Sequence, residues 1–139
     1  MATEAPLLHH TQCTAGENLS STGARNGFNG TGQFLVMAFT ADRSVIRASA
    51  ATVLPAGILQ NDPISGFIAD LGFLGVSKVI SGTVTSIVAG APLMAEGSSG
   101  GRVVIGATFA TNYAVGYALE TPAAINNVIT AMIFPAVLD

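Results

Sequence analysis

Charged residues are scarce in this chain of 139 residues. Aspartate, glutamate, lysine and arginine make up only 9% of the sequence, whereas they make up about a quarter of a typical globular domain. A surface with so few charges indicates that other protein covers part of it. The five basic residues are scattered and the net charge is −3, so no lysine or arginine cluster could neutralise a run of phosphates. We therefore expect no nucleic-acid partner.

Cysteine and the larger aromatic residues are also rare. Cys13 is the only cysteine, so the chain cannot form an internal disulfide and must be held by packing or assembly. This use of cysteine fits a protein made in a cytosol. The chain has no tryptophan and two tyrosines, which counts against a carbohydrate-binding module because sugar platforms usually rely on such rings.

Signals for export and for membranes are missing as well. Residues 1–8 lack a basic segment followed by a continuous apolar stretch, so we identify no secretory signal. The uncharged stretch at residues 121–138 is about as long as a membrane span, but Pro122, Asn126, Asn127 and Pro135 interrupt it. We predict one or two buried strands there. The chain also lacks a basic amphipathic helix, so we expect no membrane partner.

No arrangement of residues points to catalysis or to a bound metal or cofactor. His9 and His10 are adjacent, and neighbouring side chains on an extended chain point to opposite sides. Cys13 could complete a His-His-x-x-Cys metal site, but no further ligand cluster supports one. The same alternation counts against a Ser77-Lys78 dyad. We therefore expect no enzyme, no metal and no cofactor, although a pair of carboxylates meeting in space would leave a small hydrolase as an alternative.

The chain begins with a polar segment. Residues 9–32 are rich in glycine, serine and asparagine, and such a segment cannot bury enough apolar surface to offset its ordering entropy. We predict that residues 1–32 form a flexible polar N-terminal arm and that residues 33–139 form a single β domain. The few apolar anchors of the arm, which we regard as interface candidates, are Leu7, Leu8, Leu19 and Phe28.

From residue 33 onward the chain consists of short apolar runs. Residues 34–40 predict a strand buried on both faces, and a tight turn at residues 41–43 leads to a second strand at residues 44–48. Residues 49–54 are expected to be extended, and residues 55–57 to end that segment. Further strand-like runs lie at residues 67–74, 76–80, 79–88, 102–110 and 114–121. Gly72 and Gly75 interrupt the first two, as expected for a bent strand or a bulge. The spacing and the absence of a long helical stripe predict a mainly β fold, a compact barrel or sandwich of about eight short strands.

The run at residues 67–74 is more apolar than one face of a small barrel usually hides. Its large side chains belong either to the core or to a self-complementary patch that forms a trimer. Glu120 is either a solvent-facing charge at a strand end or half of an interface ion pair. These interface candidates are Phe67, Ile68, Leu71, Phe73, Leu74 and Glu120.

Four short motifs follow one another in the C-terminal part of the chain. They are Gly57–Pro63 (GILQNDP), Gly75–Val79 (GVSKV), Gly100–Val104 (GGRVV) and Val115–Glu120 (VGYALE). In order and approximate spacing, over residues 33–138, they resemble the capsid cement or head decoration proteins of tailed bacteriophages. The resemblance implies a virion structural protein that binds the outside of the assembled head, usually as a homotrimer, and clamps neighbouring major capsid subunits. It also implies synthesis in the cytoplasm of a bacterial host.

Two regions depart from that family pattern. Residues 1–32 have no clear counterpart in it, and residues 67–74 are bulkier than the small residues that related chains tend to have there. A tail, fibre or other minor virion protein is therefore kept as the alternative, and a carbohydrate-binding module as a further one.

Overall fold

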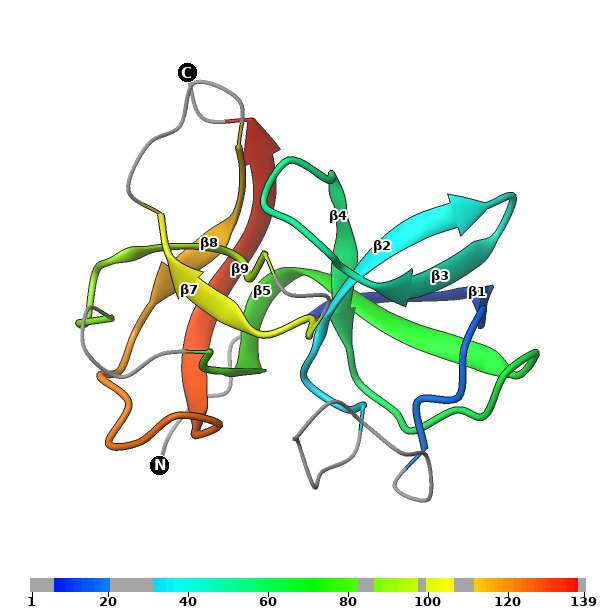
Figure 1. Ribbon diagram of the computed structural model, residues 1–139, viewed down its shortest axis with the longest axis horizontal. Coiled ribbons are helices and arrows are strands. Elements are labelled where there is room, and N and C mark those ends of the chain that lie inside the picture. The colour runs from blue at the N-terminus through cyan, green and yellow to red at the C-terminus, as the bar shows by residue number, and fades with distance from the viewer. Residues whose placement is uncertain (1–6, 21–31, 83–86, 98–99, 107–111, 138–139) are drawn as a thin grey trace.

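The chain folds entirely from β-strands in the part that the structure describes. The computed structural model describes residues 7–20, 32–82, 87–97, 100–106 and 112–137. The strands are β1 (Leu8–Ala15), β2 (Val36–Ala41), β3 (Ser44–Arg47), β4 (Pro55–Leu59), β5 (Ile68–Ile80), β6 (Pro92–Ala95), β7 (Val103–Ile105), β8 (Tyr113–Ala118) and β9 (Val128–Val137) (Figure 1). The predicted mainly β class is confirmed, with nine strands where about eight were expected.

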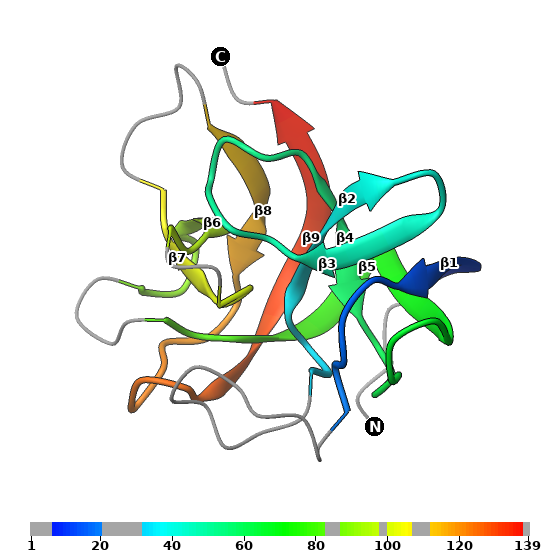
Figure 2. The ribbon, with the colours of Figure 1, turned by 45° about the vertical axis from the view of Figure 1, so that its right-hand side comes forward.

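The nine strands form one sheet that closes on itself in its first half. Their order is β1-β3-β2-β4-β5-β9-β8-β6-β7, and β1 also pairs with β5. The first five strands in this order therefore make a closed ring, which we call the first barrel, and β9, β8, β6 and β7 continue from β5 as the second sheet. Figure 2 shows the first barrel on the right and the second sheet on the left, with β5 common to both. Ring closure removes strand edges that a chain with few charges could not protect from other strands.

The length of β5 makes this arrangement possible. Its 13 residues first pair with β1 and β4, up to Leu74. From Gly75 to Ile80 the strand then pairs with β9. We expected the glycines of this region to bend the strand, and Gly75, with φ 121°, lies where the pairing changes partners. Beyond β5, Ser81 bridges to Val103, which brings the last strand of the second sheet back towards β5.

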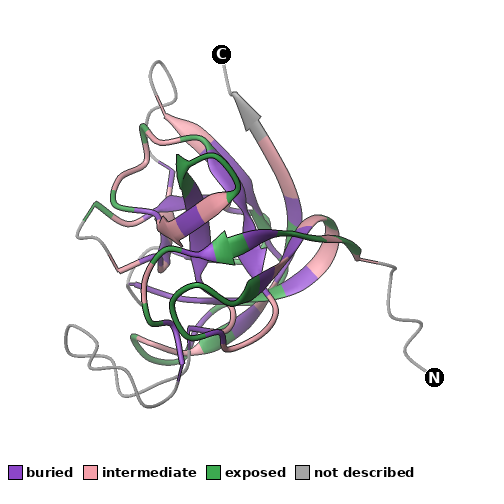
Figure 3. Ribbon diagram, turned by 90° about the vertical axis from the view of Figure 1, so that its right-hand side faces the viewer, coloured by how far each residue is buried: buried purple, intermediate pink, exposed green. Residues whose placement is uncertain are grey.

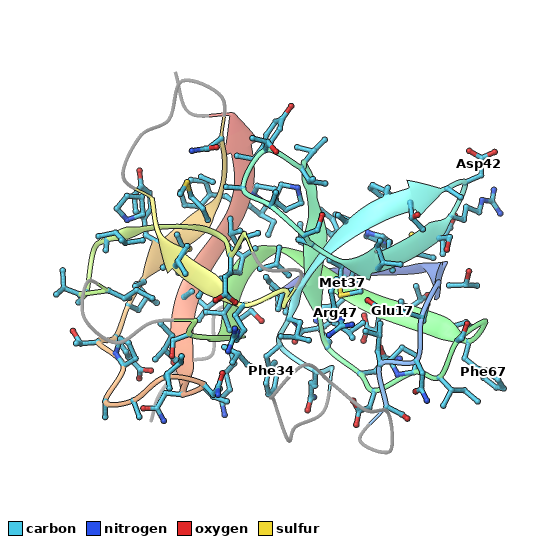
Figure 4. The ribbon with its side chains drawn as sticks, viewed as in Figure 1. Glu17, Phe34, Met37, Asp42, Arg47 and Phe67 are labelled. Atoms are coloured by element: carbon cyan, nitrogen blue, oxygen red, sulfur yellow. The ribbon has the colours of Figure 1, made fainter. Side chains whose placement is uncertain are left out.

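The described part of the protein has two hydrophobic cores, and strands β2 and β4 contribute side chains to both. Along β2, Val36 and Ala38 pack in one core, with residues of the second sheet, while Met37 packs in the core of the first barrel. Ile58 and Leu59 of β4 divide in the same way. Successive side chains of a strand point to opposite faces, so β4 and the first half of β2 are buried on two sides. The burial predicted for residues 34–40 is wrong for the second half of β2, where residues 39–41 are exposed. Figure 3 shows the buried residues gathered in the interior, and Figure 4 shows Met37 at the centre of the molecule.

The strand boundaries differ from the prediction at several places. Residues 87–88 lie in no strand, although a run at residues 79–88 was expected, and the strand expected at residues 102–110 ends at Ile105. Phe34 has a left-handed backbone (φ 69°), which ends the extended chain there, so β2 begins only at Val36. Pro55 was expected to end an extended segment, but it opens β4, and the turn at residues 51–52 precedes it. Proline is tolerated at the first residue of a strand.

The expected flexible arm does not hold for residues 8–20. Leu8–Ala15 form β1, which pairs in parallel with β3 and antiparallel with β5, and Leu19 is fully buried. Glu17 forms a bidentate ion pair with Arg47, with N···O distances of 3.0 and 2.9 Å (Figure 4). Backbone pairing on both sides holds this polar strand, which an argument from side-chain hydrophobicity misses. The other arm residues, 1–6 and 21–31, lie outside the described residues.

Candidate interaction surfaces

Large apolar side chains remain exposed on this small fold. A monomeric protein rarely exposes such side chains in contiguous patches unless the patches bind something. In the described part of the chain, such side chains line two of the hollows in the surface, which we call the groove and the loop pocket.

The groove lies where the first barrel meets the second sheet. It has a volume of about 510 Å³ and is lined by His10, Phe39, Leu54, Pro55, Ala56, Phe73, Leu74, Phe134 and Pro135. Phe39 and Leu54 are each more than half exposed. No aspartate, glutamate, lysine or arginine is among these lining residues. The groove therefore offers apolar contact with few polar groups to desolvate.

Apolar side chains continue from the groove onto the neighbouring strands. The Tyr117 ring packs on Phe134 with centroids 5.2 Å apart, and Met132 lies opposite Tyr117 in the β8–β9 register. On the other side, the exposed Leu8 lies opposite Leu74. Such a set of half-exposed side chains presents on the order of 500 Å² of apolar surface, near the upper end for a typical monomer. This surface is large enough to form the centre of a protein–protein interface.

The loop pocket lies at the turn that joins β4 to β5. It has a volume of about 410 Å³ and is lined by Asn61, Asp62, Pro63, Ile64, Phe67 and Ile68. Phe67 is 62% exposed and Ile68 59% exposed. Figure 4 shows Phe67 at the far end of the first barrel, pointing away from it.

Hydrogen bonds hold the backbone around the loop pocket in place. The Asn61 side chain donates to the Ile68 carbonyl and accepts from the Asp70 N–H, at 2.9 and 3.0 Å. The Phe67 N–H donates to the Ile64 carbonyl, and the Phe67 carbonyl accepts from the Ala15 N–H. The exposed apolar side chains of this turn are therefore carried on a fixed frame.

The predicted interface residues divide between the surface and the core. Phe73 and Leu74 line the groove, and Phe67 and Ile68 line the loop pocket. Leu71 is fully buried, as is Leu19, so both belong to the core and the interface interpretation is wrong for them in this fold.

The remaining candidates have varied positions. Leu8 is half exposed beside the groove, while the partly buried Leu7 packs against Gly72. Glu120 is exposed and accepts the Thr130 N–H at 2.8 Å. Phe28 lies outside the described residues.

Several residues of the groove and its margin were not predicted as a surface. Phe39, Leu54 and Phe134 of the groove and Tyr117 beside it come from separate parts of the chain, and strand periodicity does not distinguish an apolar residue at an interface from one in the core. The proline of the 134–135 pair was the only local signal, because proline inside a strand marks an open edge or an irregularity.

The polar side chains highlighted by the sequence have structural partners. The Ser77 hydroxyl accepts from the Gln60 amide at 2.9 Å and donates to the Lys78 carbonyl, while the Lys78 side chain is exposed. His9 Nδ1 lies 2.9 Å from Asp70 Oδ1. Burial raises the pKa of the Cys13 thiol, and the nearby Arg43 charge partly offsets this.

Within the described ranges, no three histidine, cysteine, aspartate or glutamate side chains are grouped so that they could hold a metal ion. The same part of the chain contains no helix long and apolar enough to cross a membrane.

Comparison with known proteins finds a likeness of fold. No family model matches the chain, and no curated protein sequence matches it. Among solved structures, the N base of the head fiber protein gp8.5 of bacteriophage phi29 superposes with a TM-score of 0.62 and 20% sequence identity. The match covers 96% of this chain and 99% of that one. The two chains therefore share a fold over nearly their whole lengths.

Proposed function

We propose that this chain is a structural protein of a bacteriophage virion, attached to the outside of the head. The observation that carries the proposal is the fold likeness to the base of a head fibre over 96% of the chain. The sequence motifs at Gly57–Pro63, Gly75–Val79 and Val115–Glu120 independently resemble head decoration proteins. An uncharged groove on a chain with 9% charged residues also suits a protein that works by burying surface.

In the first form of the proposal, the chain is a cement that clamps neighbouring major capsid subunits. A protein that binds only the assembled shell stabilises it by RT ln(1 + [L]/Kd), which is about 2.7 kcal/mol per site at a hundredfold excess over Kd. A homotrimer adds avidity, because the second and third subunits bind at a high effective concentration once the first is bound. Modest contacts can then stabilise a head that contains many such sites.

In the second form, the chain is the base that anchors a fibre to the head. The name of the matched structure favours this form, since it is the base of a head fibre. The two forms differ in their effect on the shell. A cement raises the melting temperature of the head because it bridges capsid subunits, whereas a base attached to one site leaves that temperature nearly unchanged.

The test of the proposal is co-sedimentation of the purified chain with heads that lack it, prepared from the phage that encodes it. We expect saturable binding at a simple ratio to the major capsid protein. Head melting, followed in parallel by light scattering, distinguishes a cement from a fibre base. Absence of binding across a range of salt concentrations would contradict both forms.

The groove is proposed to bind further copies of this chain. Replacing Leu54, which directly precedes β4 and is 51% exposed, by aspartate adds a charge to an apolar interface while sparing the core. We expect Leu54→Asp to weaken self-association at least tenfold, measured by sedimentation equilibrium, with an unchanged circular dichroism spectrum. The matched control is Leu119→Asp, which is 46% exposed and outside the groove. If the two variants change self-association equally, the groove is not part of the interface between copies.

A further inference from the structure

We propose that the loop pocket receives an arginine side chain, contributed by a subunit of the head shell. The identity of that partner rests on the function proposed above, whereas the chemistry of the pocket rests on its own residues. The pocket combines apolar walls, formed by Ile64, Phe67 and Ile68, with the partly exposed Asp62 among its lining residues. This combination fits a side chain that has an apolar stem and a cationic end.

Arginine fits these walls better than lysine does. Its planar guanidinium can stack on an aromatic ring and bind a carboxylate through two parallel N–H donors, whereas the lysine ammonium is a compact and strongly hydrated charge. Phe67, at 62% exposure, offers the ring, and Asp62 offers the carboxylate in the same hollow. The Asn61 side chain is committed to Ile68 and Asp70, so Asp62 is the side chain available to bind a cation.

Asp62 retains capacity to accept further hydrogen bonds. Its Oδ1 accepts the Gly32 N–H at 2.9 Å, a donor that also bonds to the Leu19 carbonyl. An ionised carboxylate has about four acceptor positions, so this shared donor fixes its orientation without saturating it. Two other carboxylates face cationic groups: Glu17 pairs with Arg47 and Glu96 with Arg102. Asp62, like Glu120, faces a neutral backbone donor and keeps its charge for a partner.

Hydrogen bonds fix the backbone of the loop pocket within this chain. The hydrogen bonds of Asn61 and Phe67 hold both sides of the turn, and the Leu19 N–H donates to the Pro63 carbonyl at 2.9 Å. A site that is already ordered loses little conformational entropy on binding. Buried arginine anchors are also common among the residues that dominate binding energy at interfaces. The loop pocket, with exposed apolar groups on a fixed backbone beside a carboxylate residue, is therefore suited to bind an arginine side chain of a partner.

The direct test uses N-acetyl-arginine amide as a probe, titrated into the full chain and followed by NMR. The neutral isostere N-acetyl-citrulline amide is the matched control ligand. We expect weak, saturable shifts at Ile64, Phe67 and Ile68 with the arginine probe, and at least fivefold weaker binding of the citrulline probe. Asp62→Asn retains an oxygen that can accept the Gly32 N–H, so it removes the charge with little effect on the fold. We expect it to reduce arginine binding at least fivefold, whereas Asp42→Asn, at the exposed β2–β3 turn (Figure 4), leaves it unchanged.

The same variants then test the shell as the source of the arginine. In head co-sedimentation, Asp62→Asn should weaken binding at least tenfold and flatten its salt dependence, and Asp42→Asn should do neither. If the Asp62→Asn variant binds heads as tightly as the unaltered chain does, this inference is overturned. The proposed function would then remain in place. Arginine binding by a chain that does not bind heads would reject the proposed function and keep the pocket. Equal shifts with both probes would overturn the inference.

Discussion

Gly116→Ala is expected to destabilise the fold by at least about 3 kcal/mol. A Cβ built on Gly116 would collide with the Met132 carbonyl oxygen of β9. The collision cannot be relieved by a side-chain rotation, because the opposing atom is backbone. Met132 is also paired with Val76 of β5 on its other side, so β9 cannot move away from β8 without breaking the central pairing of the second sheet.

The measurement for Gly116→Ala is urea-induced unfolding followed by circular dichroism, with Gly97→Ala as the control. Gly97 has no other heavy atom within 4 Å of the position of an added Cβ, so its replacement should change the free energy of unfolding by less than about 1 kcal/mol. Similar unfolding midpoints for the two variants would mean that β8 and β9 do not approach each other this closely. If Gly116→Ala does not accumulate as folded protein while Gly97→Ala does, the prediction also holds.

The β2–β3 hairpin shows what local sequence could predict. A continuous apolar run, a short turn at Asp42 and Arg43, and a second β-forming run specify neighbouring strands by themselves, and the structure has them paired as expected. Local signals suffice there because a hairpin needs only contacts between residues close in sequence. The same logic correctly predicted a mainly β fold of short strands.

Long-range pairing explains what the sequence did not reveal. The pairing of β1 with β5 joins His10 to Leu71, far apart in the chain, and no residue of the polar strand indicates that partner. β5 was expected as a bent strand or a bulge from its two apolar runs and their glycines, and it is one strand. Nothing in the sequence indicated that its two halves pair with different neighbours. The groove depends on the same long-range contacts, since Phe39, Leu54 and Phe134 lie together only once the ring and the second sheet have formed.

Leu19→Ala is expected to lower the free energy of unfolding by about 2–5 kcal/mol. Leu19 is 0% exposed and packs in the core of the first barrel with Leu35 and Leu59. Removing its side chain leaves a cavity that this core cannot easily fill, because backbone bonds fix the residue on both sides: its N–H donates to the Pro63 carbonyl and its carbonyl accepts the Gly32 N–H. The size of this loss measures how firmly the N-terminal residues belong to the fold.

Leu8→Ala is the matched control, since Leu8 is also in the N-terminal segment but is half exposed. We expect it to cost less than about 1 kcal/mol in the same urea-induced unfolding experiment, because the leucine loses less buried surface there. A flexible arm would give no loss of stability for either variant, and that result would contradict the ring closed by β1. A large loss for Leu19→Ala alone would mean that the polar N-terminal segment completes the first barrel through backbone pairing and one buried leucine. The same result would support a fixed backbone at the loop pocket, because the carbonyl of Pro63, one of its lining residues, accepts a hydrogen bond from the Leu19 N–H.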